Sequence, residues 1–234
     1  MTQLKAIIFG SIGTVAEVAD LQRQAYNAAF KHAELDWKWS AIAYMELLKT
    51  NDGKERIRAF RDAVPARAEV NDKMIDKLFE DQENGFVDLM GQAKLTPRPG
   101  VKELMDACLA ADVKAGLCSS SSAESMKAVN KALAKQLPLK ELASTVTMDT
   151  YSKCLEELGL SASDVVAVED TPSGVEAAKG AGIFTIATPG ETTAGQDFSA
   201  ADLVVTSLSS VTLEELQKLL EEAKEPAPAN SVHS

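Results

Sequence analysis

Cysteine and histidine are scarce in this sequence. Its 234 residues include three cysteines, Cys108, Cys118 and Cys154, and two histidines, His32 and His233. An odd number of cysteines in apolar surroundings, without paired spacing, predicts reduced and buried thiols in a reducing compartment. The spacing of the cysteines and histidines matches no zinc motif, which argues against a structural zinc site.

Long apolar runs and an excess of basic residues are also absent. No run approaches the roughly 20 residues that a membrane-spanning helix needs, and no secretory signal pattern opens the chain. The net charge of −11 disfavours binding to nucleic acid or to anionic membranes. We therefore expect a soluble protein. A cleaved transit peptide would leave no trace, so both the plastid stroma of the chloroplast and the cytoplasm are open.

Two kinds of hydrophobic pattern divide the chain. Residues 17–92 are helical throughout, with no strand pattern between them. Elsewhere short apolar runs alternate with amphipathic helices, and strands are predicted at 4–9, 113–118, 165–168, 183–187 and 203–205. This alternation predicts an α/β fold with a Rossmann-like parallel sheet and helices on both of its faces.

The same patterns predict the domain organisation. We expect a core of residues 1–16 and 93–224, with residues 17–92 inserted into it as a helical cap domain. Residues 225–234 hold two prolines and no apolar period, so we expect a disordered tail.

Capping residues mark several helix starts. Thr171 followed by Pro172 predicts an N-cap and a first-turn proline. Thr212 and Glu215 form a capping box for a final helix over residues 213–223.

Three short segments follow predicted strands and are expected to meet at one edge of the sheet. They are residues 10–14, 119–122 and 169–170. Ligands of open α/β sheets bind beyond the carboxyl ends of the strands. This edge is therefore the candidate site.

The segment 10–15 reads Gly-Ser-Ile-Gly-Thr-Val after an apolar strand. It resembles the opening signature of the haloacid dehalogenase (HAD) superfamily, Asp-x-Asp-Gly-Thr followed by Leu or Val. In that superfamily the first Asp is the nucleophile and the second is the general acid/base. Gly10 and Ile12 stand at these two positions, while Gly13 keeps its place. The resemblance thus implies a degenerate active site.

Further motifs in the same order extend the resemblance from residue 4 to about residue 220. They are Glu17, Arg23, Asn27, Asp36-Trp37-x-Trp39, Gly53-Lys54-Glu55-Arg56, Arg98-Pro99-Gly100, Glu169-Asp170, the run from Gly174 to Gly182, and Pro189-Gly190. The chain is most similar to the CbbY-like phosphatases that act on sugar bisphosphates, with beta-phosphoglucomutases as near relatives.

The superfamily's second motif is a Thr or Ser after the second strand, which binds the phosphoryl group. Ser119 matches it, and the resemblance implies residual phosphate binding by Ser119, Ser120 and Gly13. A hydroxyl and backbone N–H groups can cradle an anion at a helix start. The alternative is that the serines only cap the helix, because Ser121-x-x-Glu124 is itself a capping box.

The third motif, a lysine, is missing. Residues 144–148 contain neither Lys nor Pro before a helix that begins near Asp149-Thr150-Tyr151. The connection also looks shorter than in the superfamily. Lys140 and Lys153 are poor substitutes, because one precedes the loop by several residues and the other lies within the helix.

Glu169 and Asp170 match the pair that helps to hold Mg²⁺ in the superfamily. Magnesium prefers several oxygen ligands, so loss of the nucleophile carboxylate leaves a partial site. We therefore expect no cofactor or weakly bound Mg²⁺. The alternative is that Asp170 only stabilises the start of the next helix.

The predicted cap carries remnants of a substrate loop. The resemblance implies this role for Lys54, Arg56 and Glu17, and the two basic side chains can pair with a sugar phosphate. The alternative is a solvated helix start. Gln22 stands where the family often carries a histidine.

Phosphoryl transfer needs an aligned nucleophile and neutralised phosphate oxygens. Gly10 cannot attack phosphorus, Ile12 cannot transfer a proton, and the lysine is missing, so we predict no phosphatase activity. Ser11 is not expected to replace the nucleophile. Side chains alternate along a strand, so Ser11 would face away from a site that residues 10 and 12 face.

Three functions compete. The leading hypothesis is a catalytically inactive pseudophosphatase that acts as a binding or structural subunit, with protein partners in a larger assembly. The second is a Mg²⁺-dependent hydrolase of phosphorylated sugars with weak or altered activity. The third is a sensor that binds a sugar phosphate without turnover.

Overall fold

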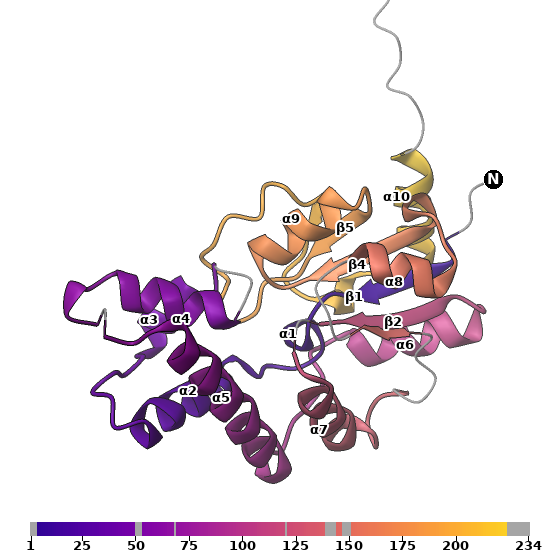
Figure 1. Ribbon diagram of the computed structural model, residues 1–234. Helices are drawn as coiled ribbons and strands as arrows, with labels where there is room; N and C mark the ends of the chain where they lie inside the picture. The colour runs from indigo at the N-terminus through magenta and orange to yellow at the C-terminus, as the bar shows by residue number, and fades with distance from the viewer. Residues whose placement is uncertain are drawn as a thin grey trace, which may run out of the picture.

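A parallel sheet of six strands forms the centre of the molecule (Figure 1). The computed structural model describes residues 4–49, 53–67, 69–119, 121–138, 144–146 and 151–223. The strands are β1 (Ala6–Phe9), β2 (Lys114–Cys118), β3 (Ser144–Val146), β4 (Val165–Glu169), β5 (Phe184–Ala187) and β6 (Leu203–Val204). Their order is β3-β2-β1-β4-β5-β6, with every neighbouring pair parallel. The predicted α/β fold class is confirmed.

Helices cover both faces of this sheet. They are α6 (Val101–Ala110), α7 (Ala123–Leu133), α8 (Tyr151–Leu158), α9 (Pro172–Gly180) and α10 (Leu213–Glu222). Figure 1 shows α6 and α7 on one side of the sheet and α8 and α9 on the other. All four residues of β1 are buried. Ile7 and Phe9 belong to one hydrophobic cluster, and Ala6 and Ile8 to another. The alternation of side chains along β1 therefore serves two cores.

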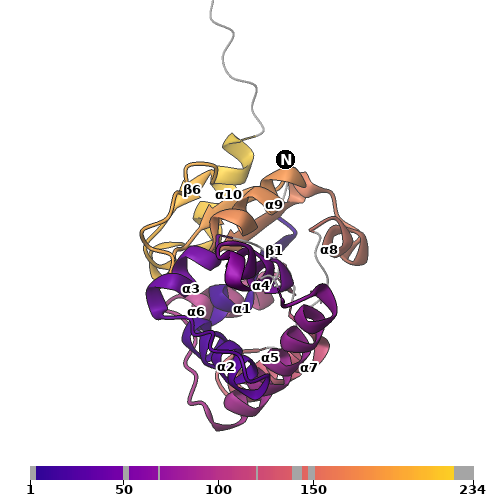
Figure 2. The same ribbon diagram turned by 60° about the vertical axis from the view of Figure 1, so that its left-hand side comes forward.

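Residues 19–92 form the helical part of the chain beside the sheet (Figure 2). Its helices are α2 (Ala19–His32), α3 (Ala41–Leu47), α4 (Gly53–Asp62) and α5 (Asp72–Gln92), with a short turn of helix at Pro65–Arg67. Tyr26, Phe30, Trp37, Trp39 and Tyr44 fill a separate aromatic cluster there. Phe86 and Met90 of α5 instead join the cluster under the sheet. The division into a core and a cap of residues 17–92 remains a proposal.

The predicted helix starts agree with the structure at two positions. Thr171 caps α9, with Pro172 as its first residue, and Thr212 and Glu215 form the complete capping box of α10. The capping box predicted at Ser121 is wrong. Ser122 caps α7 instead, and its hydroxyl accepts from the backbone N–H of Ser125 at 3.2 Å.

Strand β3 was not predicted from the sequence. Its three residues carry no hydrophobic alternation strong enough to indicate a strand, and pairing with Gly116, Leu117 and Cys118 of β2 defines it. The predicted tail at 225–234, the residues Lys140, Asp149 and Thr150, and most of the shortened loop lie outside the described residues. Within the described part of the chain, no helix is long and apolar enough to cross a membrane.

Candidate active site

A cavity of about 210 Å³ opens between the carboxyl ends of the strands and the helical segment. Gly10, Ser119 and Glu169 line it from the sheet, and Tyr26 and Gln82 line it from the helices. The three segments that were expected to meet at this edge of the sheet all contribute residues to it.

The chain turns into a short helix directly after β1. Gly10 still donates its N–H to the carbonyl of Val168 at 2.8 Å, and α1 (Ile12–Val15) begins two residues later. Ser11 is the N-cap of α1, and its hydroxyl donates to Asp170 Oδ1 at 2.6 Å. The prediction that Ser11 faces away from the site is therefore wrong. Strand alternation ends with β1, and the cap geometry directs Ser11 into the cavity.

The space beside Gly10 is filled by two other side chains. The Tyr151 hydroxyl donates a hydrogen bond to Glu169 Oε1. A Cβ added at Gly10 would lie 1.8 Å from Glu169 Oε1 and 2.1 Å from the Tyr151 hydroxyl. On the other side, a Cβ at Gly174 would lie 2.1 Å from Glu169 Oε2. The Glu169 carboxyl group thus lies between Gly10 and Gly174. A side chain at position 10 would fit only if the Glu169 carboxyl group moved.

Ile12 occupies the second position at which the resemblance places an aspartate. Its side chain is 2% exposed and belongs to the hydrophobic cluster under the sheet. It also borders the cavity. An apolar side chain therefore stands where the resemblance places a proton-transferring carboxylate.

Burial governs the electrostatics of the two adjacent carboxyl groups. It raises the pKa of Glu169 to about 8, and the charge of Asp170 adds to this effect. The pKa of Asp170 is also raised, mainly by burial, while the hydrogen bond from Ser11 and the charges of Arg98 and Arg56 oppose the shift. Glu169 Oε2 is buried and has no hydrogen-bond partner among the described residues. Burial therefore favours the neutral, protonated form of Glu169.

The stability of the chain is expected to fall as the pH rises from about 5 to 8. The ordinary pKa of Glu169 is 4.5, so the unfolded chain loses a proton that the folded chain still holds, and deprotonation favours unfolding. Each unit by which the pKa is raised corresponds to about 1.4 kcal/mol. Denaturant unfolding at several pH values, with EDTA present, should show a smaller decline for Glu169→Gln. Equal declines in both proteins would contradict the shift.

The candidate phosphate-binding residues lie at the same edge. Ser119 is 5% exposed and lines the cavity, and its hydroxyl accepts from the N–H of Ser121 at 3.2 Å. Gly13 also lines the cavity, where a Cβ would lie 2.1 Å from Asp170 Oδ2. Ser120 lies outside the described residues.

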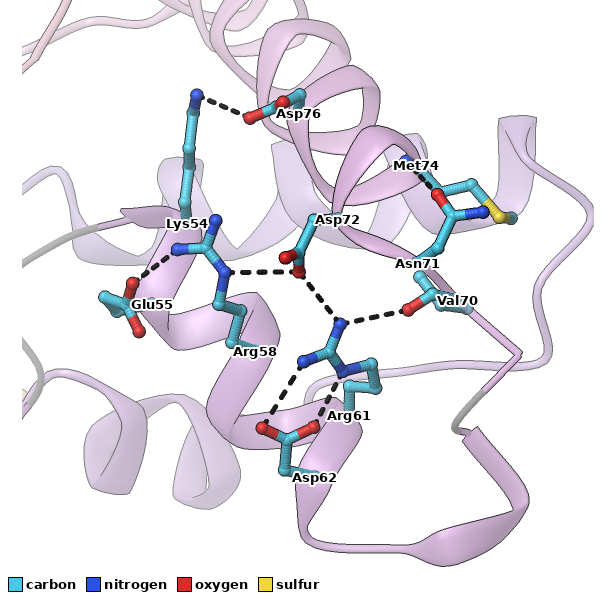
Figure 3. Close-up of polar contacts among 10 residues, drawn as sticks. All are labelled: Lys54, Glu55, Arg58, Arg61, Asp62, Val70, Asn71, Asp72, Met74 and Asp76. Carbon is cyan, nitrogen blue, oxygen red and sulfur yellow. Dashed lines mark hydrogen bonds and ion pairs between the residues drawn. The ribbon is translucent and has the colours of Figure 1, made fainter.

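The candidate substrate-loop residues separate. Arg56 lines the cavity, and its charge lowers the pKa of Asp170. Glu17 also lines it, with Oε1 3.3 Å from Arg98 Nε, and burial is the main cause of its raised pKa. Lys54 is not among the lining residues. Its ammonium group pairs with Asp76 Oδ1 of α5 at 2.6 Å (Figure 3).

Sequence reasoning missed the polar residues that α5 contributes. Gln82 and Glu83 both line the cavity. Gln82 lies on the buried face of α5 between Leu78 and Phe86, where the helical period predicts an apolar residue. That break in the apolar stripe was a readable signal.

The residues present do not fit the Mg²⁺ site that the resemblance implies. Asp170 Oδ1 accepts from Ser11 and Glu169 Oε1 accepts from Tyr151, although Glu169 Oε2 is buried without a partner. In the described part of the chain no group of three or more His, Cys, Asp or Glu side chains is placed to hold a metal ion. Two carboxyl groups, both with pKa values raised by burial, are compatible with weak Mg²⁺ binding only.

Comparisons with known proteins identify the family. Residues 7–188 match the haloacid dehalogenase-like hydrolases. The chain is 30% identical over 228 residues to protein CbbY of Rhodobacter capsulatus, covering 93% of this chain and 99% of that protein. The crystal structure of CbbY from Rhodobacter sphaeroides in complex with phosphate superposes with a TM-score of 0.77 and 28% identity, over 88% of this chain and 96% of that one. A mutant of the same protein, in complex with xylulose-(1,5)bisphosphate, gives the same values. This chain belongs to the haloacid dehalogenase-like hydrolase family.

Proposed function

We propose that this chain binds a phosphorylated sugar in the cavity between its helical segment and the edge of the sheet. The complexes of the CbbY relative with phosphate and with xylulose-(1,5)bisphosphate support this ligand class. Ser119 and Arg56 line the cavity of this chain, and a hydroxyl and a guanidinium group suit phosphate oxygens. Among the described lining residues Arg56 is the sole cation, so we expect affinity to fall as salt rises.

We further propose that binding is not followed by phosphoryl transfer to residue 10. Glycine at position 10 offers no nucleophile, and the observation that supports this proposal further is the Tyr151–Glu169 pair, which fills the space that a larger side chain would need. Ile12 contributes no titratable group to replace a general acid/base. Ser11 lines the cavity, but its hydroxyl donates to Asp170, whose own pKa is raised. Attack by the Ser11 hydroxyl, with Asp170 as its base, is the alternative reaction that the Ser11→Ala variant tests.

The second candidate is a Mg²⁺-dependent hydrolase of phosphorylated sugars with weak or altered activity. Membership of a hydrolase family and the likeness to CbbY favour it. These comparisons favour both sugar-phosphate functions over the structural-subunit hypothesis that the sequence analysis placed first. A protein partner stays a prediction that the native size of the protein in its source extract would test. The compartment, plastid stroma or cytoplasm, also stays a prediction.

The experiment combines phosphate release with calorimetric binding. Wild type, Ser11→Ala and Arg56→Met are incubated with Mg²⁺ and xylulose bisphosphate, ribose phosphate or glucose phosphate. We expect wild type to bind at least one sugar phosphate and to release phosphate at the rate of the protein-free control. Arg56→Met should weaken binding by about tenfold, the value of one charge-assisted contact.

The outcomes separate the candidates. Phosphate release by wild type that Ser11→Ala abolishes would establish the hydrolase candidate. Release that persists in Ser11→Ala would also establish hydrolysis, with a nucleophile other than Ser11. Absence of both binding and release across the ligands would refute both sugar-phosphate functions.

A further inference from the structure

Gln82 is a polar residue in an apolar stripe. The buried residues of α5 are Ile75, Leu78, Gln82, Phe86 and Met90, spaced three or four positions apart. This spacing places Gln82 at the middle of the face that α5 turns inward. The residues before and after it on this face are all apolar.

The Gln82 carbonyl oxygen is buried without compensation. The residue is 2% exposed, and its Oε1 has no hydrogen-bond partner among the described residues. Burying an amide oxygen without a hydrogen-bond partner lowers the free energy of unfolding. An apolar side chain of similar shape would carry no such penalty. A buried amide oxygen that finds no partner among the described residues calls for an explanation, and a bound ligand is one that can be tested.

The cavity is where that partner can bind. Gln82 lines it from α5, and Glu169, whose Oε2 is also unpartnered among the described residues, lines it from the sheet. Each of these two walls thus holds one buried oxygen that has no partner among the described residues. A ligand hydroxyl would reach the Gln82 oxygen once the amide group turns toward the cavity that the residue lines.

Glu83 holds α5 in place beside the cavity. Its Oε2 accepts from the N–H of Ser122 at 3.0 Å and from the Ser125 hydroxyl at 2.8 Å. Both partners lie at the start of α7, so α5 is hydrogen-bonded directly to the α/β part of the chain. The position of Gln82 relative to the cavity is therefore set by contacts that its own side chain does not make.

We propose that Gln82 is a specificity-determining residue whose Oε1 accepts a hydrogen bond from a hydroxyl group on the sugar portion of the bound ligand. This inference rests on the proposed binding of a phosphorylated sugar. A site built to hydrogen-bond a hydroxyl discriminates against ligands that lack it, because the buried acceptor is then left unpaired.

The test compares Gln82→Met with wild type in calorimetric titrations and thermal unfolding. Methionine keeps the shape of glutamine and removes its amide. The ligands are xylulose bisphosphate, ribose phosphate, glucose phosphate, and methyl phosphate, which carries no sugar hydroxyl. Gln92→Met is the matched control, because Gln92 is an exposed residue at the end of the same helix.

We expect Gln82→Met to weaken at least one sugar phosphate by about tenfold, the loss of one hydrogen bond, while its affinity for methyl phosphate stays that of wild type. The ligand-free variant should also melt at a higher temperature than wild type. Gln92→Met should change neither property.

Three results would overturn the inference. Equal affinities of wild type and Gln82→Met for every sugar phosphate would refute it and leave the proposed function intact. Equal weakening of methyl phosphate and the sugar phosphates would assign Gln82 a structural role. Failure of wild type to bind any sugar phosphate would refute the proposed function, and this inference with it.

Discussion

The double variant Gly10→Asp/Ile12→Asp is expected to release no phosphate and to be strongly destabilised. An aspartate Cβ at position 10 would displace Glu169 and Tyr151 from their hydrogen-bonded positions, since it would lie 1.8 Å from Glu169 Oε1. An aspartate at position 12 would replace a side chain that is 2% exposed and packed in the main hydrophobic cluster. We expect a loss of about 4 kcal/mol or more in the free energy of unfolding.

Single variants separate the two causes. Gly10→Ala adds only the colliding Cβ, and Ile12→Val removes one methylene group at a cost of about 1 kcal/mol. Gly10→Ala should cause the larger loss in the free energy of unfolding, because its Cβ meets two side chains that already fill the space beside residue 10. Phosphate release well above wild type, with an unchanged melting temperature in the presence of Mg²⁺, would show that the site remains preorganised for aspartyl chemistry.

Arg98→Met is expected to lower the free energy of unfolding by about 3–5 kcal/mol, because it leaves several buried acceptors unpaired. The Arg98 side chain is 9% exposed. Its guanidinium donates to the carbonyls of Gly13 at 3.1 Å, Thr188 at 2.8 Å and Pro189 at 2.8 Å, and it also pairs with Glu17. One side chain thus joins the segment after β1 to the segment after β5.

Two control variants test the cause of this loss. Arg98→Lys keeps the charge but not the planar group that reaches several carbonyls, so it should recover only part of the stability. Arg61→Met removes an arginine that pairs with Asp62 and Asp72 and donates to the carbonyl of Val70 (Figure 3). Surface ion pairs contribute little, and one carbonyl loses its donor instead of three, so this loss should be much smaller. Denaturant unfolding of the three variants measures the order, and equal losses at Arg98 and Arg61 would contradict it.

Local sequence determined the architecture of this protein. Short apolar runs that alternate with amphipathic helices predict a parallel sheet covered on both faces, because the periods of side-chain burial are properties of neighbouring residues. The N-cap at Thr171 and the capping box at Thr212 were readable for the same reason, since their hydrogen bonds span three residues. The absence of carboxylates at residues 10 and 12 was equally evident, because it depends on side-chain identity alone.

Tertiary structure decided which side chains occupy the space around residues 10 to 12. Tyr151 and Glu169 fill the space beside Gly10, and this contact joins residues far from it in the sequence. The direction of Ser11 follows from the helix that begins after β1 and from Asp170, not from strand alternation. Neither arrangement has a local period, so no pattern in the chain predicts it.

The same distinction applies to the cavity wall. Lys54 and Arg56 are two residues apart in one motif, yet the ammonium group of Lys54 pairs with Asp76 while Arg56 lines the cavity. Gln82 was visible in the sequence as a break in an apolar stripe. Only the packing of α5 beside α7 and the sheet shows that this residue lines the cavity and that its carbonyl oxygen is buried without a partner among the described residues. Sequence periodicity assigns residues to the buried face of an element, whereas the contacts across elements depend on segments that only the folded chain brings together.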